Sequence, residues 1–257
     1  MKEKRIVIKI GTGVLTKADG KLNRASLWHL VDVVSQLQNK GFSCILVSSG
    51  AVGAGVEAFQ LSSYPEDLAT KQACAAVGQS SLMQVYQNLF ENFELNVAQI
   101  LLAPQDFNVD TQKALLNNCL SRLLDEPKVI PIVNENDVTA VEELKFGDND
   151  QLSARVAQLI QAECLFLLTS TDGLLPPDGG CIIDEVEAVD TVIDFANGET
   201  GKFSTGGMAS KLQAIKKSVE AGIETFIING EHPERILDYL GNYPENAIGT
   251  RFLPQEA

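Results

Sequence analysis

The segment Lys4-Arg-Ile-Val-Ile-Lys-Ile-Gly-Thr-Gly13 indicates the fold, because it is the first of several short apolar, β-branched runs. Each of these runs precedes a stretch with helical periodicity. They cover residues 4–10, 43–48, 97–103, 128–133, 164–169 and 225–229. Alternation of this kind predicts an α/β protein with a mainly parallel sheet covered by helices.

The helical stretches are predicted from apolar residues spaced three and four positions apart. The clearest lies between the first two runs, with Asn23 as its expected N-cap and Gly41 just past its end. Further helices are expected at roughly 66–93, 111–125, 149–162, 207–221 and 232–241. The glycines and prolines of 170–205 predict loops or a short hairpin.

The 257 residues fit one domain, with an N-terminal lobe of about 1–170 and a C-terminal lobe of about 171–257. No linker, charge block or internal repeat divides the chain. The formal net charge is −14 and the sequence pI is about 4.6. A nucleic-acid partner is therefore not expected, since binding a phosphate backbone requires a clustered basic surface.

Features of secretion and membrane insertion are missing from the sequence. The apolar run of the first strand is interrupted at Lys9, and no window approaches the roughly 18 apolar residues of a membrane span. The five cysteines form no C-x-x-C pair and no disulfide pattern. We therefore expect a cytoplasmic protein without a membrane partner.

Polar and small residues gather where the apolar runs end. They occupy positions 9–13, 48–53, 134–137 and 169–173, and a further group at 147–150 precedes a predicted helix. In open parallel sheets, ligands bind outside the carboxyl ends of the strands. These residues are therefore the candidates for a binding site.

Lys9 is costly to bury inside an apolar strand unless it meets an anion. The alternative is an edge lysine whose ammonium group reaches solvent. Residues 49–51 resemble a turn from a strand into a helix, where backbone N–H groups can bind an anion. The alternative is a turn of small residues that allows tight packing. No G-x-G-x-x-G fingerprint and no Walker motif is present, so the motifs of dinucleotide-binding and P-loop enzymes are excluded.

The segment 205–211 opens a helix with two glycines and places Lys211 in the first turn, where the helix dipole disfavours positive charge. The alternative is a glycine loop before an ordinary surface helix. Together with Lys9, however, the segment 205–211 would form a clamp for a phosphate group. Residues 148–150 are typical of a helix N-cap with an acidic first turn, and this role is compatible with a second role in ligand binding. With Glu135 and Asp137 they suit an amine-bearing substrate and a metal–nucleotide complex.

The motifs occur in an order that resembles the amino acid kinase family over nearly the whole chain, in the branch that phosphorylates the side-chain carboxylate of glutamate. They are Lys9-Ile-Gly-Thr12, Ser48-Ser-Gly-Ala51, Ile132-Val-Asn-Glu-Asn-Asp137, Gly147-Asp-Asn-Asp-Gln-Leu-Ser-Ala154, Leu168-Thr-Ser-Thr-Asp-Gly-Leu174 and Thr205-Gly-Gly-Met-Ala-Ser-Lys211. Each motif alone is weak, whereas six in order are specific. The resemblance implies a three-layer αβα sandwich that makes glutamyl 5-phosphate from ATP, the first step of proline biosynthesis.

The resemblance also implies roles for individual residues. The catalytic set is Lys9, Lys211 and Asp150, in which Asp150 holds both ammonium groups. The glutamate-binding set is Ser49, Gly50, Asn134, Asp137, Asp148 and Asn149. The nucleotide-binding set is Lys9, Gly11, Thr169, Ser170, Asp172, Gly173, Thr205, Gly206, Gly207, Met208, Ala209, Ser210 and Lys211. Backbone N–H groups of Gly11 and Gly50 are expected to contact the phosphoryl group, and Mg²⁺ is expected with ATP, without an assigned protein ligand.

Two features depart from the family's pattern. Ser170 stands where aspartate is more common, and the chain has no room for the C-terminal PUA domain of many members. Feedback inhibition by proline and a homo-oligomer, either dimer or tetramer, are expected. Two alternatives stay open: a sibling kinase acting on acetylglutamate, aspartate, carbamate or UMP, and a non-catalytic amino-acid sensor.

Overall fold

The computed structural model describes residues 4–17, 19–139, 149–177, 179–196, 207–241 and 248–255. Within them one sheet has the strand order β3-β4-β2-β1-β5-β7-β8-β6. The strands are β1 (Lys4–Ile10), β2 (Phe42–Ser48), β3 (Asn96–Leu102), β4 (Val129–Glu135), β5 (Cys164–Thr169), β6 (Glu185–Val186), β7 (Glu224–Asn229) and β8 (Thr250–Phe252). All neighbours are parallel except β7 and β8. The six predicted strands are confirmed within two residues at each end.

Helices of the described residues connect these strands. They are α1 (Thr12–Leu15), α2 (Arg24–Asn39), α3 (Ala51–Ala58), α4 (Leu68–Phe90), α5 (Gln105–Asn108), α6 (Asp110–Leu124), α7 (Asn149–Leu159), α8 (Met208–Glu220) and α9 (Arg235–Leu240). Short 3₁₀ turns cover Glu91–Phe93, Val189–Thr191 and Ile193–Ala196. The predicted helices are confirmed, and Asn23 caps α2 by accepting a hydrogen bond from the Ser26 N–H.

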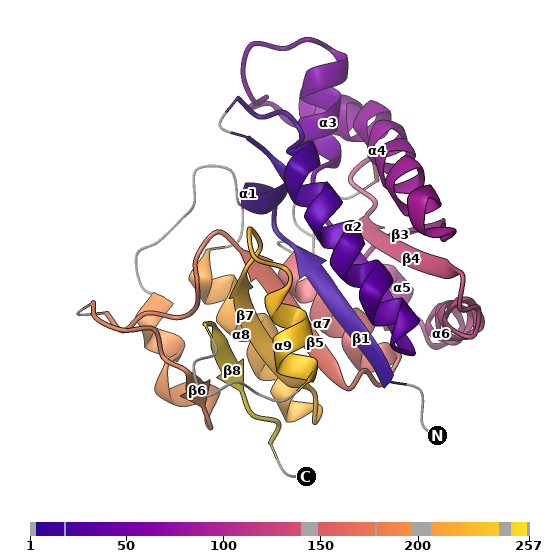
Figure 1. Ribbon diagram of the computed structural model, residues 1–257. Coiled ribbons are helices and arrows are strands. Elements are labelled where there is room, and N and C mark those ends of the chain that lie inside the picture. Colours follow the sequence, from indigo (N-terminus) through magenta and orange to yellow (C-terminus); the bar gives the residue numbers. More distant parts are fainter. Residues whose placement is uncertain are drawn as a thin grey trace.

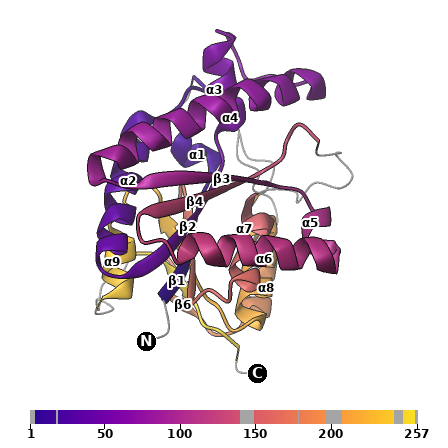
Figure 2. The same cartoon turned by 90° about the vertical axis from the view of Figure 1, so that its right-hand side faces the viewer.

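The sheet lies between two layers of helices (Figures 1 and 2). On one face, Ile6, Ile8 and Ile10 of β1 belong to a core cluster with residues of α2, α4 and α9. On the other face, Val7 belongs to a second cluster with residues of α6, α7 and α8. Both faces of the central strands are thus buried, which explains their continuous apolar runs. The three-layer αβα sandwich is confirmed.

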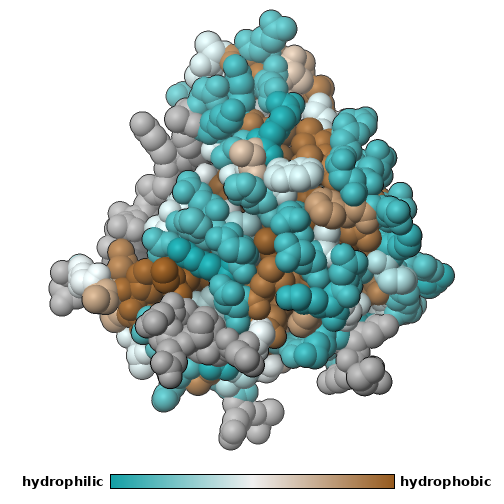
Figure 3. All heavy atoms as spheres, in the orientation of Figure 1, coloured by the Kyte–Doolittle hydropathy of each residue, from teal (hydrophilic) through white to brown (hydrophobic). Residues whose placement is uncertain are grey.

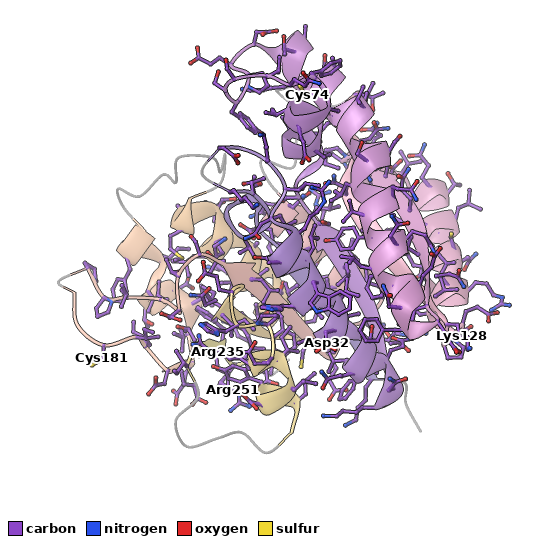
Figure 4. All side chains as sticks on the ribbon, turned by 45° about the horizontal axis from the view of Figure 1, so that its top comes forward. Asp32, Cys74, Lys128, Cys181, Arg235 and Arg251 are labelled. Carbon is purple, nitrogen blue, oxygen red and sulfur yellow. The ribbon has the colours of Figure 1, made fainter. Side chains whose placement is uncertain are left out.

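The short hairpin considered for 170–205 does not form in the described part of that segment. β6 instead pairs in parallel with β8, which follows more than sixty residues later. Arg251 of β8, labelled in Figure 4, forms ion pairs with Glu185 of β6 and Glu224 of β7. These cross-strand charge pairs join β6 to the distant end of the chain.

The turn from β2 into α3 depends on two glycines. Gly50 has a φ of +103°, a left-handed conformation that favours glycine. At Gly78 of α4, an added Cβ would lie 1.8 Å from the carbonyl oxygen of Ala51. The backbones of α3 and α4 therefore approach too closely for any side chain there. This close approach fixes the start of α3 above the end of β2.

The surface seen in Figure 3 is mainly hydrophilic, with apolar side chains in separate areas. Among the described residues, no helix has both the length and the apolar character needed to cross a membrane.

Candidate active site

Lys9 lies at the centre of the sheet. Its strand β1 pairs with β2 on one side and β5 on the other, so Lys9 is opposite Val47 and Leu167. The alternative of an edge lysine is therefore wrong. Because side chains alternate along a strand, Lys9 shares the face of Val7, where α7 and α8 pack. Its side chain is only 6% exposed.

Asp150 joins two ammonium groups in the interior. It is the second residue of α7, its side chain is 1% exposed, and its Oδ1 lies 2.6 Å from Lys9 Nζ. Lys211 Nζ, from the first turn of α8, donates to Asp150 Oδ2 at 2.8 Å. Burial by itself raises the pKa of Asp150, but the two ammonium groups outweigh it and hold that pKa well below its usual range.

These three side chains carry a net charge of +1 at the carboxyl ends of parallel strands. The single carboxylate neutralises only one of the two buried ammonium charges. Binding of a further anion is therefore favourable, because charges interact strongly in a low-dielectric interior. The arrangement can bind and neutralise a phosphoryl group. Lys9 and Lys211, which are distant along the chain, are brought together here by Asp150.

Gln151 binds the start of α8 to α7. Its Nε2 donates to the carbonyl oxygen of Ser210 at 3.0 Å, and its Oε1 accepts from Lys217 Nζ at 2.8 Å. Ser210 directly precedes Lys211. Two neighbouring residues of α7 therefore hold the first turn of α8, Asp150 by a side-chain ammonium group and Gln151 by a backbone carbonyl.

A network of side-chain amides lies beside these charges. Asn149 Nδ2 donates to Ser49 Oγ and to Asn134 Oδ1, each at 3.0 Å. Asn134 Nδ2 in turn donates to Gln79 Oε1 at 3.0 Å. The Oδ1 of Asn149 is buried and has no partner among the described residues. A buried acceptor without a donor is unfavourable, so this oxygen suits a ligand that brings an N–H group.

Asp137 lies near Tyr64, which precedes α4. Burial raises the pKa of Tyr64 to about 12, and the charge of Asp137 contributes to the same shift. Gln72 of α4 donates to the carbonyl oxygen of Val138 at 3.3 Å and so ties the segment after β4 to that helix. Asp148, expected to bind glutamate, lies outside the described residues.

Gly11 lies against the Lys9 ammonium group, since an added Cβ would be 3.6 Å from its Nζ. However, the Gly11 N–H donates to the carbonyl oxygen of Leu168 at 3.0 Å. The pairing of β1 with β5 thus continues one residue past the strand. In this structure that N–H is already used, so it contacts a phosphoryl group only if this bond opens.

Four of the predicted nucleotide residues, Thr169, Ser170, Asp172 and Gly173, lie at or just after the end of β5. Asp172 Oδ1 accepts from Arg235 Nη1 at 2.8 Å and from Asn229 Nδ2 at 3.3 Å. The hydrogen bond from Arg235, which Figure 4 labels, is the main cause that lowers the pKa of Asp172. Ser170 lies beside Gly13, where an added Cβ would be 3.8 Å from the serine Cβ.

The remaining nucleotide residues are only partly described. Thr169 ends β5, and its carbonyl oxygen accepts from the Gly230 N–H at 2.8 Å. Gly173 packs tightly, since an added Cβ would be 2.8 Å from Thr250 Oγ1. Gly207 is the N-cap of α8 and Met208 and Ala209 are its first residues, whereas Thr205 and Gly206 lie outside the described residues.

A family model described as the amino acid kinase family matches residues 4–229. The chain belongs to the amino acid kinase family. Among the curated proteins that this chain resembles are two named glutamate 5-kinase. The one from Clostridium acetobutylicum is 44% identical over 98% of this chain and 95% of its own, and the one from Rippkaea orientalis is 45% identical over 97% and 69%. This chain therefore matches nearly the whole of one relative and about two thirds of the other.

The solved structures agree on the amino acid kinase fold. Carbamate kinase from Giardia lamblia, bound to AMP-PNP, superposes with a TM-score of 0.66 over 99% of both chains at 16% identity. At this level of identity the similarity concerns the fold alone.

Sequence reasoning missed Gln79, Gln151 and Arg235. The sequence does contain a signal for Gln79. One face of the predicted helix is formed by Ala75, Gln79, Leu82 and Tyr86, and a polar residue on such an apolar face needs a buried hydrogen-bond partner. Gln151 and Arg235 act through a backbone carbonyl and an exposed carboxylate of distant segments. No local pattern points to those contacts.

Proposed function

We propose that this chain transfers the γ-phosphoryl group of ATP to the side-chain carboxylate of glutamate, producing glutamyl 5-phosphate for proline biosynthesis. The observation that carries the proposal is the buried group of Lys9, Asp150 and Lys211 at the carboxyl ends of the sheet. The two relatives named glutamate 5-kinase support the choice of glutamate as the substrate.

The chemistry needs no general base. A glutamate side chain has a free pKa of about 4.3, so the nucleophilic carboxylate is already ionised at neutral pH. Phosphoryl transfer then depends on alignment and on neutralising charge. Lys9 and Lys211 supply positive charge to the transferring group, and Asp150 fixes the direction of both ammonium groups.

The amide network can bind the α-amino end of glutamate, opposite the reacting carboxylate. The Oδ1 of Asn149, which has no partner among the described residues, can accept a hydrogen bond from the α-ammonium group, and Asp137 adds the negative charge that a free amine favours. By resemblance to the family, Asp148 is expected to add a second carboxylate. Ser49, Gly50 and Asn134 complete this side. An acetylated amine carries no charge for these carboxylates, which argues against acetylglutamate.

ATP is proposed to bind at residues 169–173 and 207–211, in the C-terminal lobe. The buried ammonium pair fits phosphate groups. Among the described residues, no cluster of three or more His, Cys, Asp or Glu side chains could hold a metal ion. Mg²⁺ bound to nucleotide phosphates needs few protein ligands, and it neutralises charge on the β- and γ-phosphates.

Four statements stay predictions: a homo-oligomer of two or four chains, inhibition by proline, a cytoplasmic location and the absence of a nucleic-acid partner. Exposed apolar side chains on α4, β3 and α6 support self-association, among them Val77, Leu101 and Leu115. A sensor without catalysis is disfavoured because Lys9, Asp150 and Lys211 are all present and in contact.

The test is ADP release from Mg-ATP with glutamate, N-acetylglutamate, aspartate, carbamate and UMP in parallel. Hydroxylamine is included to trap an acyl phosphate as a hydroxamate. The proposal predicts hydroxamate with glutamate alone. Turnover only with another acceptor would contradict the substrate, and no turnover with any of the five would favour the sensor.

A further inference from the structure

One amide side chain of α4 enters the core. Gln79 is 9% exposed and lies in the same helical stripe as Ala75, Leu82 and Tyr86, which are buried and mainly apolar. Both ends of its amide are hydrogen bonded. Oε1 accepts from Asn134 Nδ2 at 3.0 Å, and Nε2 donates to Gln99 Oε1 on the edge strand β3 at 3.3 Å.

The direction of this network is fixed by the backbone. Asn134 Oδ1 accepts from the N–H of Glu135 at 2.9 Å, and an N–H cannot exchange its role as an amide side chain can. Asn134 must therefore point its Nδ2 at Gln79. The same oxygen accepts from Asn149 Nδ2, and this orientation leaves the buried Asn149 Oδ1 without a partner among the described residues.

Gln79 supplies the acceptor that keeps Asn134 in this orientation. Asn134 is 3% exposed, so its Nδ2 has no water to replace a lost partner without movement of the side chain. If Asn134 moves, Asn149 loses one of the two acceptors that orient its amide.

We propose that Gln79 is a positioning residue for substrate recognition, which acts through Asn134 to present Asn149 Oδ1 to the ammonium group of the amino-acid substrate. This inference rests on the proposed glutamate kinase function. Gln79 itself touches no substrate in this arrangement, so its effect is on recognition of the amine and not on phosphoryl transfer.

The test compares the wild type with Gln79→Met, which keeps the side-chain volume and removes both hydrogen bonds. We expect the KM for glutamate to rise roughly 10-fold, since a tenfold change corresponds to about one lost hydrogen bond. The kcat and the KM for ATP are expected to stay within about 3-fold. Glutarate, which lacks the amine, is used as a competitive inhibitor, and its Ki should change less than about 2-fold.

A rescue variant and a control accompany this change. Gln79→Glu keeps an acceptor for Asn134, and the exposed Gln99 is able to turn its amide and donate to the other carboxylate oxygen. Its KM for glutamate should return to within about 3-fold of wild type. Gln84 is an exposed glutamine of the same helix whose Nε2 donates to Asn88 on the helix surface, so Gln84→Met should change none of these constants.

An unchanged KM for glutamate in Gln79→Met would overturn the proposal. So would equal changes in the glutamate KM, the ATP KM and the glutarate Ki, which indicate general damage to the fold. The wild type is assayed first. If it fails to turn over glutamate, the proposed function is wrong and this proposal falls with it, whereas an active wild type with an unchanged variant refutes only the role of Gln79.

Discussion

Replacing Asp150 with asparagine removes the carboxylate that contacts both buried ammonium groups. Breaking a buried ion pair by removing one partner typically costs about 3–5 kcal/mol, and Asp150 has two such partners. For 257 residues, an unfolding entropy of about 2.1 cal/mol/K per residue gives about 0.5 kcal/mol/K in total. We therefore expect Asp150→Asn to lower the Tm by roughly 6–10 °C.

The assays are thermal unfolding at pH 7, which gives the Tm, and urea unfolding at pH 7 and at pH 3, which gives the unfolding free energy; both are followed by circular dichroism. The pKa of Asp150 is lowered in the folded state from an ordinary value of 3.8, so its stabilisation is complete above 3.8 and decreases as the pH falls toward the folded pKa. Each pH unit below 3.8 removes about 1.4 kcal/mol of the contribution that Asp150 makes in the wild type, and the variant lacks this contribution. The difference in unfolding free energy should therefore shrink by about 1 kcal/mol at pH 3.

Asp190→Asn is the matched control, because Asp190 forms an exposed ion pair with Lys216. Exposed pairs contribute at most about 1 kcal/mol, so this variant should lose little stability at pH 7. The reasoning would be refuted if Asp150→Asn lost no more stability than Asp190→Asn, or if its difference from wild type were the same at both pH values.

Three further predictions follow from single features. Lys9→Ala should lower kcat by roughly 100-fold or more with the glutamate KM within about 3-fold, measured by steady-state kinetics, and equal changes in both would contradict its role in transfer. Gly50→Val should cost about 1–3 kcal/mol in urea unfolding, because φ is +103° at that position, and an unchanged midpoint would argue against this turn. In the folded protein only Cys119 and Cys181 should react rapidly with a thiol reagent, since Cys44, Cys74 and Cys164 are buried and burial raises their thiol pKa values. Figure 4 labels Cys181 on an outer loop and Cys74 where α3 meets α4, and rapid reaction of a third thiol would count against this packing.

The central strands were predictable because the burial of both faces leaves a continuous apolar run, as in β1 and β5. The exceptions were short elements. β6 and β8 have two and three residues, and α1 and α5 have four each, so none carries enough residues to establish a period. β6 in addition depends on a partner from the end of the chain.

Parts of the candidate site were predictable for a different reason. Lys9 is conspicuous because a charge inside an apolar strand needs a partner, and the end of a parallel strand is where ligands bind. Its grouping with Lys211 around Asp150 came from resemblance, since no spacing in the sequence relates residues 9, 150 and 211. The engagement of the Gly11 N–H by Leu168 was not predictable, because it depends on how far the ladder between β1 and β5 extends.

The proposed function rests on one chemical step, the attack of the glutamate carboxylate on the γ-phosphorus of ATP. It is tested most directly with glutamate carrying ¹⁸O in both side-chain carboxyl oxygens. One of these oxygens becomes the bridge of the acyl phosphate, and hydroxylamine then breaks the bond between carbon and that oxygen, leaving it on phosphate. We expect inorganic phosphate with one ¹⁸O atom by mass spectrometry, whereas unlabelled phosphate would mean transfer to water and would contradict attack by the carboxylate.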